Sequence, residues 1–453
     1  MSEHSPSPAV MWFRRDLRLE DNPALLEACA GTSGVLLLFV VDPRLWEPAG
    51  PARRAYLVAS LARLDESVGG RLVVRHGDPA REVVRAATEA GAGTVHVAAD
   101  FGPYGSRRDR AVEEALAEHG VELCRTGSAY AVAPGRVVNG SGEGYKVFTP
   151  FARAWAEHGW RAPAGRPAPE QRWLTAESDG VPQASVPDGL TLPSAGEEAA
   201  HRRWREFLES VAEYDDARDR PDLDGTSRMS VHLKWGEIHP RTLLADLGAR
   251  RSKGAATYRN ELAWREFYAD VLHRRPDTAR EYLRREFASM EYDEPGDDLA
   301  AWQEGRTGFP IVDAGMRQLR ATGWMHNRVR MIVASFLVKD LHLEWQLGAR
   351  HFMRCLVDGD LASNQHGWQW VAGCGTDAAP YFRVFNPISQ GRKFDPDGLY
   401  VRRWVAELAD VDKAYIHEPS TQPGGLPEGY PPPLLDHAEE RREALARLER
   451  MKS

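Results

Sequence analysis

Short apolar runs alternate with amphipathic helical patterns through residues 1–135, and this alternation constrains the fold more than any other feature of the chain. The runs with the length and composition of buried strands are Ala9 to Phe13, Val35 to Val41, Leu72 to Arg75, Thr94 to Ala98 and Val121 to Arg125. The helical patterns between them are Arg53 to Ser67, Ala80 to Ala90 and Ser106 to His119. Such alternation predicts a parallel sheet with helices on both faces. We therefore expect residues 1–135 to form a Rossmann-like α/β domain.

Two polar loops follow predicted strands of this domain. Arg14-Arg15-Asp16 comes after the first strand, and the loop from Asp100 to Gly105 comes after the fourth. Ligands of parallel sheets bind at the carboxyl ends of strands, so these loops are candidate binding elements. No GxGxxG follows the first strand, and the glycine cluster at 140–144 does not lie between a strand and a helix. The sequence therefore disfavours a dinucleotide site of the dehydrogenase kind.

The rest of the chain predicts a second domain of a different class. With 453 residues, the chain exceeds one ordinary core. Residues 136–200 form a predicted linker, with six prolines between positions 161 and 198. Residues 201–453 carry mostly helical patterns and nine of the fourteen tryptophans, so we expect an all-α domain that holds the aromatic chemistry.

The composition of the chain indicates where in the cell we expect the protein. No apolar run approaches the about 20 residues needed to span a bilayer, so we expect no membrane association. The first eight residues lack the pattern of a secretory signal. The four cysteines are scattered and form no CxxC pair, which fits a reducing cytoplasm and indicates no metal site.

The charge of the chain supports two opposite interpretations of whether the protein binds nucleic acid. The net charge of −8 argues weakly against a nucleic-acid partner, whereas residues 311–355 carry seven Lys or Arg against three acids. An ordinary solvated helix face and a nucleic-acid-binding face both fit such a local excess.

The run from Thr322 to Met331 carries the most specific chemistry. Asn327, Arg330 and Met331 are spaced so that they share one face of a helix that continues through residues 332–341. An amide, a guanidinium and a thioether on one face suit a flat heteroaromatic ligand that carries anionic groups. A second polar cluster follows at residues 358–364, with Trp368-Gln369-Trp370 directly after it.

Two further segments allow a functional or a structural interpretation. Thr226 to Ser230, ahead of a helical segment, can cradle a pyrophosphate or simply cap a helix. Glu261, Trp264, Arg265 and Tyr268 form one helical stripe, which is either a pocket wall or a surface ion pair beside core aromatics. Tryptophans such as Trp345 and Trp368 usually pack in cores, although indoles also relay single electrons.

Long motifs of the chain resemble a known family. Besides the runs at 322–331 and 358–370, the motifs are Trp12 to Arg18, Thr307 to Leu319 and Gly375 to Pro387. Together they resemble class I cyclobutane pyrimidine dimer (CPD) DNA photolyases of bacterial type, within the photolyase/cryptochrome family. The resemblance covers nearly the whole chain. It implies an α/β antenna domain, an all-α FAD-binding domain, and light-driven DNA repair in which reduced FAD passes one electron to the dimer.

The resemblance also implies roles for individual residues. The expected FAD ligands are Tyr214, Thr226, Ser227, Arg228, Met229, Ser230, Glu261, Arg265, Trp324, Arg330, Asp358, Asp360 and Asn364. The expected catalytic residues are Glu261, Asn327, Asn364 and Met331, with Asn364 facing flavin N5 and with Glu261 and Asn327 contacting the dimer. The expected DNA-binding residues are Trp264, Trp370, Arg328, Arg383 and Arg218. Trp368 and Trp345 match the proximal and middle members of the family's photoreduction relay, and Tyr292 stands where its third tryptophan usually lies.

An antenna chromophore is implied for the first domain. The residues that match its binding site are Asp42, Arg53, Asp100, Tyr104 and, at the domain boundary, Lys253. They are more similar to the 8-hydroxy-5-deazaflavin group than to the methenyltetrahydrofolate group, although Gly102 replaces an acidic residue often seen there.

Three alternatives remain. A cryptochrome photoreceptor shares the fold, but Asn364, Glu261, Trp264 and Met331 match the repair pattern. A (6-4) photolyase typically has histidine where Asn327 stands. A helical nucleic-acid-binding protein without catalysis would bind no flavin. The expected partner is ultraviolet-damaged DNA containing CPDs, and we expect a monomer.

Overall fold

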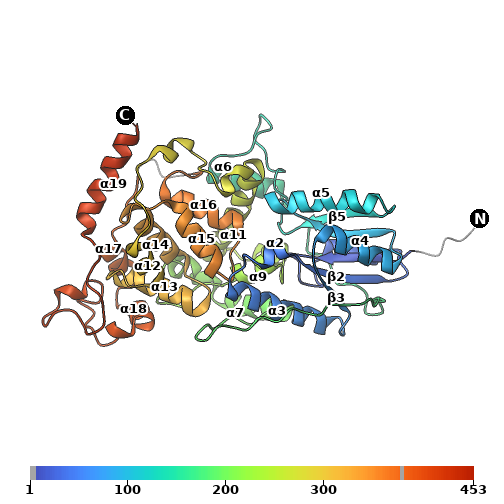
Figure 1. The fold of residues 1–453 in the computed structure, drawn as a ribbon, viewed down its shortest axis with the longest axis horizontal. Helices are drawn as coiled ribbons and strands as arrows, with labels where there is room; N and C mark the ends of the chain where they lie inside the picture. Colours follow the sequence, from blue (N-terminus) through green and yellow to red (C-terminus); the bar gives the residue numbers. More distant parts are fainter. Residues whose placement is uncertain (1–6, 378–381, 453) are drawn as a thin grey trace, which may run out of the picture.

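The computed structural model describes residues 7–377 and 382–452 and contains the predicted parallel sheet (Figure 1). All five strands pair in parallel, in the order β3-β2-β1-β4-β5. The strands are β1 (Ala9–Phe13), β2 (Val35–Val41), β3 (Leu72–His76), β4 (Thr94–Ala99) and β5 (Glu122–Ser128). The α/β prediction is confirmed, and the first two strands have the predicted bounds.

Helices cover both faces of the sheet, as the alternating pattern predicts. They are α1 (Pro23–Cys29), α2 (Pro43–Trp46), α3 (Pro51–Ser67), α4 (Pro79–Ala90) and α5 (Pro103–Ala117). Helices α1 and α3 pack on one face, and α4 and α5 pack on the other. Each begins at a proline, whose fixed φ suits the first helical turn. The sequence pattern missed the seven-residue α1, which Asn22 caps through its side chain.

The topology brings the two polar loops together. Strand β1 pairs with β4 on one side and with β2 on the other, so the direction of winding reverses between β1 and β4. The loops after β1 and β4 therefore meet at the carboxyl end of the sheet, where open α/β sheets bind ligands. The guanidinium of Arg14 donates to Asp109 at 2.6 Å and to the carbonyl oxygen of Ala98, which closes this junction.

The segment 136–200 is not uniformly irregular. Helix α6 (Phe148–His158) packs its Phe151 and Trp155 into the core of the second domain. The indole nitrogen of Trp155 donates to the buried carboxylate of Glu266 at 2.5 Å. Between His158 and Glu197 the chain contains no helix, and only Trp173 forms a bridge, with Val35 at the start of β2.

The second domain is helical. Its α-helices are α7 (Glu197–Glu209), α8 (Tyr214–Ala217), α9 (Ser230–Trp235), α10 (Pro240–Gly248), α11 (Lys253–Arg274), α12 (Asp297–Glu304), α13 (Pro310–Thr322), α14 (Asn327–Lys339), α15 (Trp345–Cys355), α16 (Leu361–Ala372), α17 (Pro387–Phe394), α18 (Leu399–Trp404) and α19 (His437–Lys452). Short 3-10 turns are η1 (Val211–Glu213), η2 (Pro276–Ala279), η3 (Arg285–Ser289), η4 (Ala406–Leu408) and η5 (Pro419–Thr421). The largest core lies among α13, α14, α15 and α16. In the described ranges, no helix is both long and apolar enough to cross a membrane.

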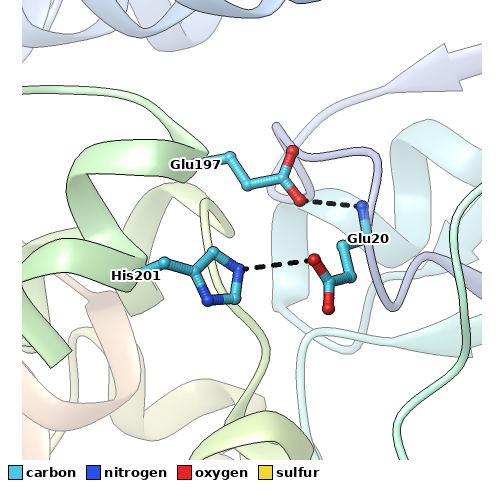
Figure 2. Close-up of side chains that lie close together, drawn as sticks. All are labelled: Glu20, Glu197 and His201. Atoms are coloured by element: carbon cyan, nitrogen blue, oxygen red, sulfur yellow. Dashed lines mark hydrogen bonds and ion pairs between the residues drawn. The ribbon is translucent and has the colours of Figure 1, made fainter. Parts of the chain in front are cut away.

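An ion-paired joint fixes the first domain on the start of the second (Figure 2). The carboxylate of Glu197, at the first position of α7, accepts the backbone N–H groups of Leu19 and Glu20 at 3.1 and 2.8 Å. His201 Nε2 lies 4.0 Å from the Glu20 carboxylate. The guanidinium of Arg166 lies 3.2 Å from Glu197 and 3.5 Å from Glu20. Although two carboxylates and a histidine can ligate a cation, here an arginine already supplies the positive charge.

Candidate active site

One wall of the site is formed where the segment before α14 meets the loop before α9. The indole nitrogen of Trp324 donates to Ser230 Oγ at 3.3 Å, and the guanidinium of Arg228 lies over the Trp324 ring at 5.1 Å. Arg228 has a φ of 55°, a left-handed conformation that non-glycine residues adopt mainly at constrained functional positions. The predicted phosphate cradle at residues 226–230 and the predicted ring contact Trp324 are therefore adjacent.

The cradle is held from behind by a residue that the sequence did not suggest. Ser227 Oγ and Tyr258 Oη are hydrogen-bonded at 2.8 Å, and the Tyr258 ring contacts the Tyr214 ring edge-on at 5.2 Å. The Ser227 hydroxyl also accepts the backbone N–H of Met229 at 3.2 Å. Tyr258 thus joins the predicted ligands Tyr214 and Ser227, and only its place on helix α11 could have indicated this.

Two carboxylates form the second wall. Asp358 accepts two hydrogen bonds from Arg330, at 2.8 and 3.2 Å, while Arg330 Nε donates to the Met325 carbonyl. Asp360 caps α16 by accepting the Ser363 N–H at 3.1 Å. Both carboxylates are therefore fixed by the predicted motifs at 322–331 and 358–364.

Asp360 also receives a hydrogen bond from the first domain. Arg15, in the loop after β1, lies 2.6 Å from the Asp360 carboxylate. Burial opposes ionisation of Asp360, but Arg15 and Lys234 hold its pKa well below the ordinary value. A carboxylate that stays ionised in a buried place is a strong hydrogen-bond acceptor for hydroxyl or amine groups of a ligand.

Helix α16 carries the amide and the proximal indole. Asn364 Nδ2 donates to the carbonyl of Ala349 at 3.1 Å, and Trp368 lies one turn later on the same face. Gly348 on α15 lies directly against that indole, since a Cβ there would be 2.1 Å from Trp368 Cη2. Because Trp345 lies one turn before Gly348, Trp368 packs on the helix face that bears Trp345.

Glu261 lies in an ion-pair network between α11 and α14. Its carboxylate is 2.6 Å from Arg218, whose guanidinium lies over the Tyr214 ring at 5.9 Å. Burial raises the pKa of Glu261 although Arg218 opposes the shift. Next in the chain, Asp219 holds Arg328 at 2.9 Å, and Arg328 Nη1 lies 3.7 Å from Met331 Sδ.

The remaining predicted residues of the site have distinct places. Asn327 is exposed at the first position of α14. Arg265 donates to the carbonyls of Ala129 and Leu233 at 3.0 and 3.4 Å and lies over the Tyr130 ring. These contacts make Arg265 a link between the end of the first domain and α9.

A basic groove lies beside this network. Its volume is about 520 Å³ and its lining includes Arg328, Arg383 and Lys393, with Asp219 as its acidic member. Trp264 stacks on Phe148 with centroids 3.7 Å apart and planes 8° apart, while Trp370 Nε1 donates to the Asp377 carbonyl at 3.0 Å. Phe148 was not predicted, because it lies in the segment assigned to the linker.

A second cluster lies at the carboxyl end of the sheet. The Tyr104 hydroxyl donates to Asp42, and Arg108 lies 3.2 Å from Asp100 and 5.1 Å above the Trp12 ring. Burial opposes ionisation of Asp100, but Arg108 and Arg15 keep its pKa below the ordinary value. Arg108 is a member of this cluster that sequence reasoning did not name, and Trp12 was named only as part of a family motif, with no antenna role.

The two lysines near the domain boundary differ in their exposure and in their neighbours. Lys253 is 80% exposed and pairs with Asp215 at 2.5 Å, within the helical domain. Lys234 is half-buried, burial lowers its pKa to about 7, and the charges of Arg15, Asp360, Arg53 and Asp100 also act on it. Lys234 therefore lies within electrostatic range of the predicted antenna residues Arg53 and Asp100, whereas Lys253 pairs with Asp215.

The first two walls and the α16 face fit FAD. Hydroxyl, N–H and guanidinium groups at 226–230 suit a pyrophosphate, and the carboxyl groups of Asp358, paired with Arg330, and Asp360, paired with Arg15, suit hydroxyl or amine groups. Among the described residues, His326 Nε2 is a buried polar atom without a protein partner beside Arg328 and Arg330. A buried donor or acceptor of this kind is costly unless a ligand satisfies it.

Comparisons with known proteins agree with this geometry. The family model for DNA photolyase matches residues 9–170, and that for the FAD binding domain of DNA photolyase matches residues 258–450. The chain is 42% identical to the deoxyribodipyrimidine photo-lyase of Streptomyces griseus, over 98% of this chain and 99% of that protein. It is 39% identical to the Escherichia coli enzyme of the same name, over 97% and 98%.

Solved structures show the same likeness. A class III photolyase from Agrobacterium tumefaciens superimposes with a TM-score of 0.91 at 37% identity, covering 100% of both chains. A Synechocystis cryptochrome superimposes with a TM-score of 0.87 at 26% identity, covering 98% of this chain and 99% of that one. The chain therefore belongs to the DNA photolyase family.

Proposed function

We propose that this chain is a light-driven DNA-repair lyase that splits cyclobutane pyrimidine dimers with bound FAD. The observation that carries the proposal is the position of Glu261, a carboxyl group with a raised pKa, between the predicted flavin ligands and the basic groove. Relatives that bear the name deoxyribodipyrimidine photo-lyase support it.

When bound, reduced FAD supplies the absorption of light and the single electron that opens the cyclobutane ring. The chain supplies binding and orientation. Arg228 and the Thr226–Ser230 backbone would hold the pyrophosphate, Asp358 and Asp360 would accept hydrogen bonds, and the Asn364 amide would face the reactive ring. The burial of Asp358 and Asn364 would exclude water from the reacting groups.

Glu261 would act where negative charge develops on the dimer. Burial raises the pKa of Glu261 above that of a free glutamate, and a carboxyl that becomes protonated can donate a hydrogen bond to a pyrimidine carbonyl, whereas a carboxylate can only accept. A donor fixed at the site of developing charge stabilises the transition state. Asn327 and Met331, on the nearby first turns of α14, would complete the contact with the dimer.

The basic groove would bind the damaged strand. Arg328, Arg383 and Arg218 would contact phosphates, which positions the DNA without reading its sequence. A dimer stacks poorly, so it costs less to extrude than a normal base pair. Trp264 and Trp370 would flank the extruded dimer, with the Trp264 indole oriented by its stack on Phe148.

The cluster at the carboxyl end of the sheet would bind the antenna. We assign it to 8-hydroxy-5-deazaflavin, with methenyltetrahydrofolate as the second candidate. Asp42, Tyr104, Asp100 and Arg53 are retained from the sequence assignment, and Lys234 takes the place given there to Lys253. We further propose that the protein is a class I enzyme, that it is a monomer and that it works in the cytoplasm. All four cysteines are free thiols.

Chemically reduced protein should restore thymines in a CPD-containing oligonucleotide only under near-ultraviolet or blue light. The measurement is the count of restored thymines against the dark control. A protein that binds FAD but shows no light-dependent restoration would instead act as a cryptochrome-type photoreceptor, and restoration of (6-4) lesions alone would identify the other photolyase class.

Repair per absorbed photon should fall as pH rises through the raised pKa of Glu261, because the donating form exists below that pKa. Glu261→Gln donates at every pH and should remove this dependence. Glu261→Ala should lower the yield by roughly tenfold or more, since a hydrogen bond to a charged group contributes about 1.5–3 kcal/mol. Flavin absorbance of each variant is the control; loss of all flavin in Glu261→Ala would make Glu261 a structural residue.

Arg328→Ala should weaken binding to damaged and undamaged DNA alike. It should also reduce the slope of log affinity against log salt by about 1, as expected for one lost phosphate contact. Arg63→Ala, which removes an exposed arginine paired with Glu66 on α3, is the matched control and should change neither quantity. An unchanged slope in Arg328→Ala would remove this residue from the DNA-binding surface.

Reconstitution with 8-hydroxy-5-deazaflavin should add a violet absorption band and speed repair at those wavelengths. Lys234→Met should weaken uptake of the chromophore, whereas Lys253→Met should leave it unchanged, because Lys234 lies within electrostatic range of Arg53 and Asp100 and Lys253 pairs with Asp215. Saturating uptake of the folate without uptake of deazaflavin would contradict the assignment.

A further inference from the structure

A row of aromatic rings leads outward from Trp345. The Trp345 ring contacts the Tyr282 ring edge-on, with centroids 6.0 Å apart and planes at 88°. The Tyr282 ring in turn stacks on Tyr292, with centroids 6.4 Å apart and planes at 24°. Tyr282 therefore lies between Trp345 and the tyrosine that the sequence assigned to the end of the relay.

Trp345 has no place to release a proton. Its side chain is fully buried, and within the described residues its indole nitrogen has no hydrogen-bond acceptor. If Trp345 loses one electron, the resulting indole cation keeps its N–H proton. Such a cation remains a strong oxidant and attracts an electron from the nearest oxidisable ring.

Within the part of the chain that the structure describes, Tyr282, unlike Trp345, has a proton acceptor. Its side chain is only 4% exposed, yet its hydroxyl donates to Glu344 Oε1 at 3.1 Å. Glu344 is exposed at the residue before α15, so its carboxylate connects the buried phenol to solvent. Burial raises the pKa of Tyr282 well above the ordinary value, so the phenol cannot lose its proton before it is oxidised. The acceptor lies within the reach that proton transfer requires.

We propose that Tyr282 is the terminal electron donor of the photoreduction relay, with Glu344 as its proton acceptor. The inference rests on the relay role of Trp368 and Trp345 proposed from the family resemblance. Oxidised FAD, when bound and illuminated, would supply the oxidant, and Trp368 and Trp345 would carry one electron to it, which leaves the Trp345 cation. One electron then passes from Tyr282 to the Trp345 cation while the phenolic O–H bond breaks and a carboxyl O–H bond forms on Glu344. The products are neutral Trp345, a neutral Tyr282 phenoxyl radical and protonated Glu344, so charge, protons and electrons balance.

Tyr292 is less suited to this role. Its hydroxyl donates to the backbone carbonyl of Phe287 at 3.4 Å and also shares a hydrogen bond with the Tyr282 hydroxyl, so neither partner is a carboxylate. A peptide carbonyl is a far weaker base than a carboxylate and cannot retain the proton. Tyr292 therefore packs on Tyr282 and shields it from solvent, and Tyr292→Phe is a matched control that keeps the stacked ring.

The experiment is flash photolysis of the FAD-loaded, oxidised enzyme, followed by transient absorption and by electron paramagnetic resonance of protein labelled with ring-deuterated tyrosine. Wild-type and Tyr292→Phe proteins should form a tyrosyl radical, and its formation should be slower in D₂O. Tyr282→Phe should lose that radical and should prolong the Trp345 radical cation. Glu344→Gln keeps a hydrogen-bond acceptor but loses the base that can retain the proton, so it should slow tyrosyl formation by roughly tenfold or more.

Two results would overturn the inference. One is a tyrosyl radical that persists in Tyr282→Phe and disappears in Tyr292→Phe. The other is an unchanged rate and isotope effect in Glu344→Gln, a surface substitution that leaves the ring packing intact. Repair by chemically reduced protein bypasses the relay, so all three variants should repair dimers like wild type. Loss of repair in wild type would refute the proposed function, whereas the radical measurements test the relay alone.

Discussion

The ion pair between Arg15 and Asp360 is the contact on which the rest of the site depends. Arg15 lies in the loop after β1, and Asp360 is the residue that caps α16. The pair therefore fixes the start of α16, which carries Asn364 and Trp368, against the carboxyl end of the sheet. Both side chains are only partly exposed, at 28% and 12%, so removing one partner would leave a poorly solvated charge without compensation. The same contact thus joins the domains and sets the position of the chemistry.

The structure also explains how an acidic protein can present a DNA-binding surface. The net charge of −8 is spread over the whole chain, whereas Arg328, Arg383 and Lys393 line one groove. Asp219 holds Arg328 by two hydrogen bonds, at 2.9 and 3.3 Å, so this guanidinium is already oriented before DNA arrives. The acidic neighbour reduces the local positive charge. Because it also holds the guanidinium in place, less entropy is lost when a phosphate binds.

Local patterns predicted what depends on local sequence. The parallel sheet, its two polar loops and the segments 226–230, 322–331 and 358–364 follow from periodicity and spacing, and the structure brings those segments together. Contacts between distant segments were not predictable in the same way. Tyr258, Lys234 and Phe148 look like ordinary core or surface residues until the fold places them beside the site. Lys253, assigned to the antenna from its place in the sequence, is exposed and pairs with Asp215 in the structure, and its antenna role stays a prediction.

In the proposed function, helices α16 and α15 carry residues of two electron routes. Asn364 donates to the carbonyl of Ala349, and Trp368, one turn away, lies against α15 where only glycine at position 348 allows the indole to approach. From there the rings of Trp345 and Tyr282 lead to Glu344 at the surface. An electron route toward DNA needs no proton acceptor, because its electron returns after each turnover. A route that keeps the flavin reduced must leave the oxidised residue far from the flavin. That residue stays oxidised only when it loses a proton together with its electron. Among the described residues, Trp345 is a buried indole without a proton acceptor, whereas the Tyr282 phenol is hydrogen-bonded to the exposed carboxylate of Glu344. Of the two, only Tyr282 can therefore lose a proton together with its electron.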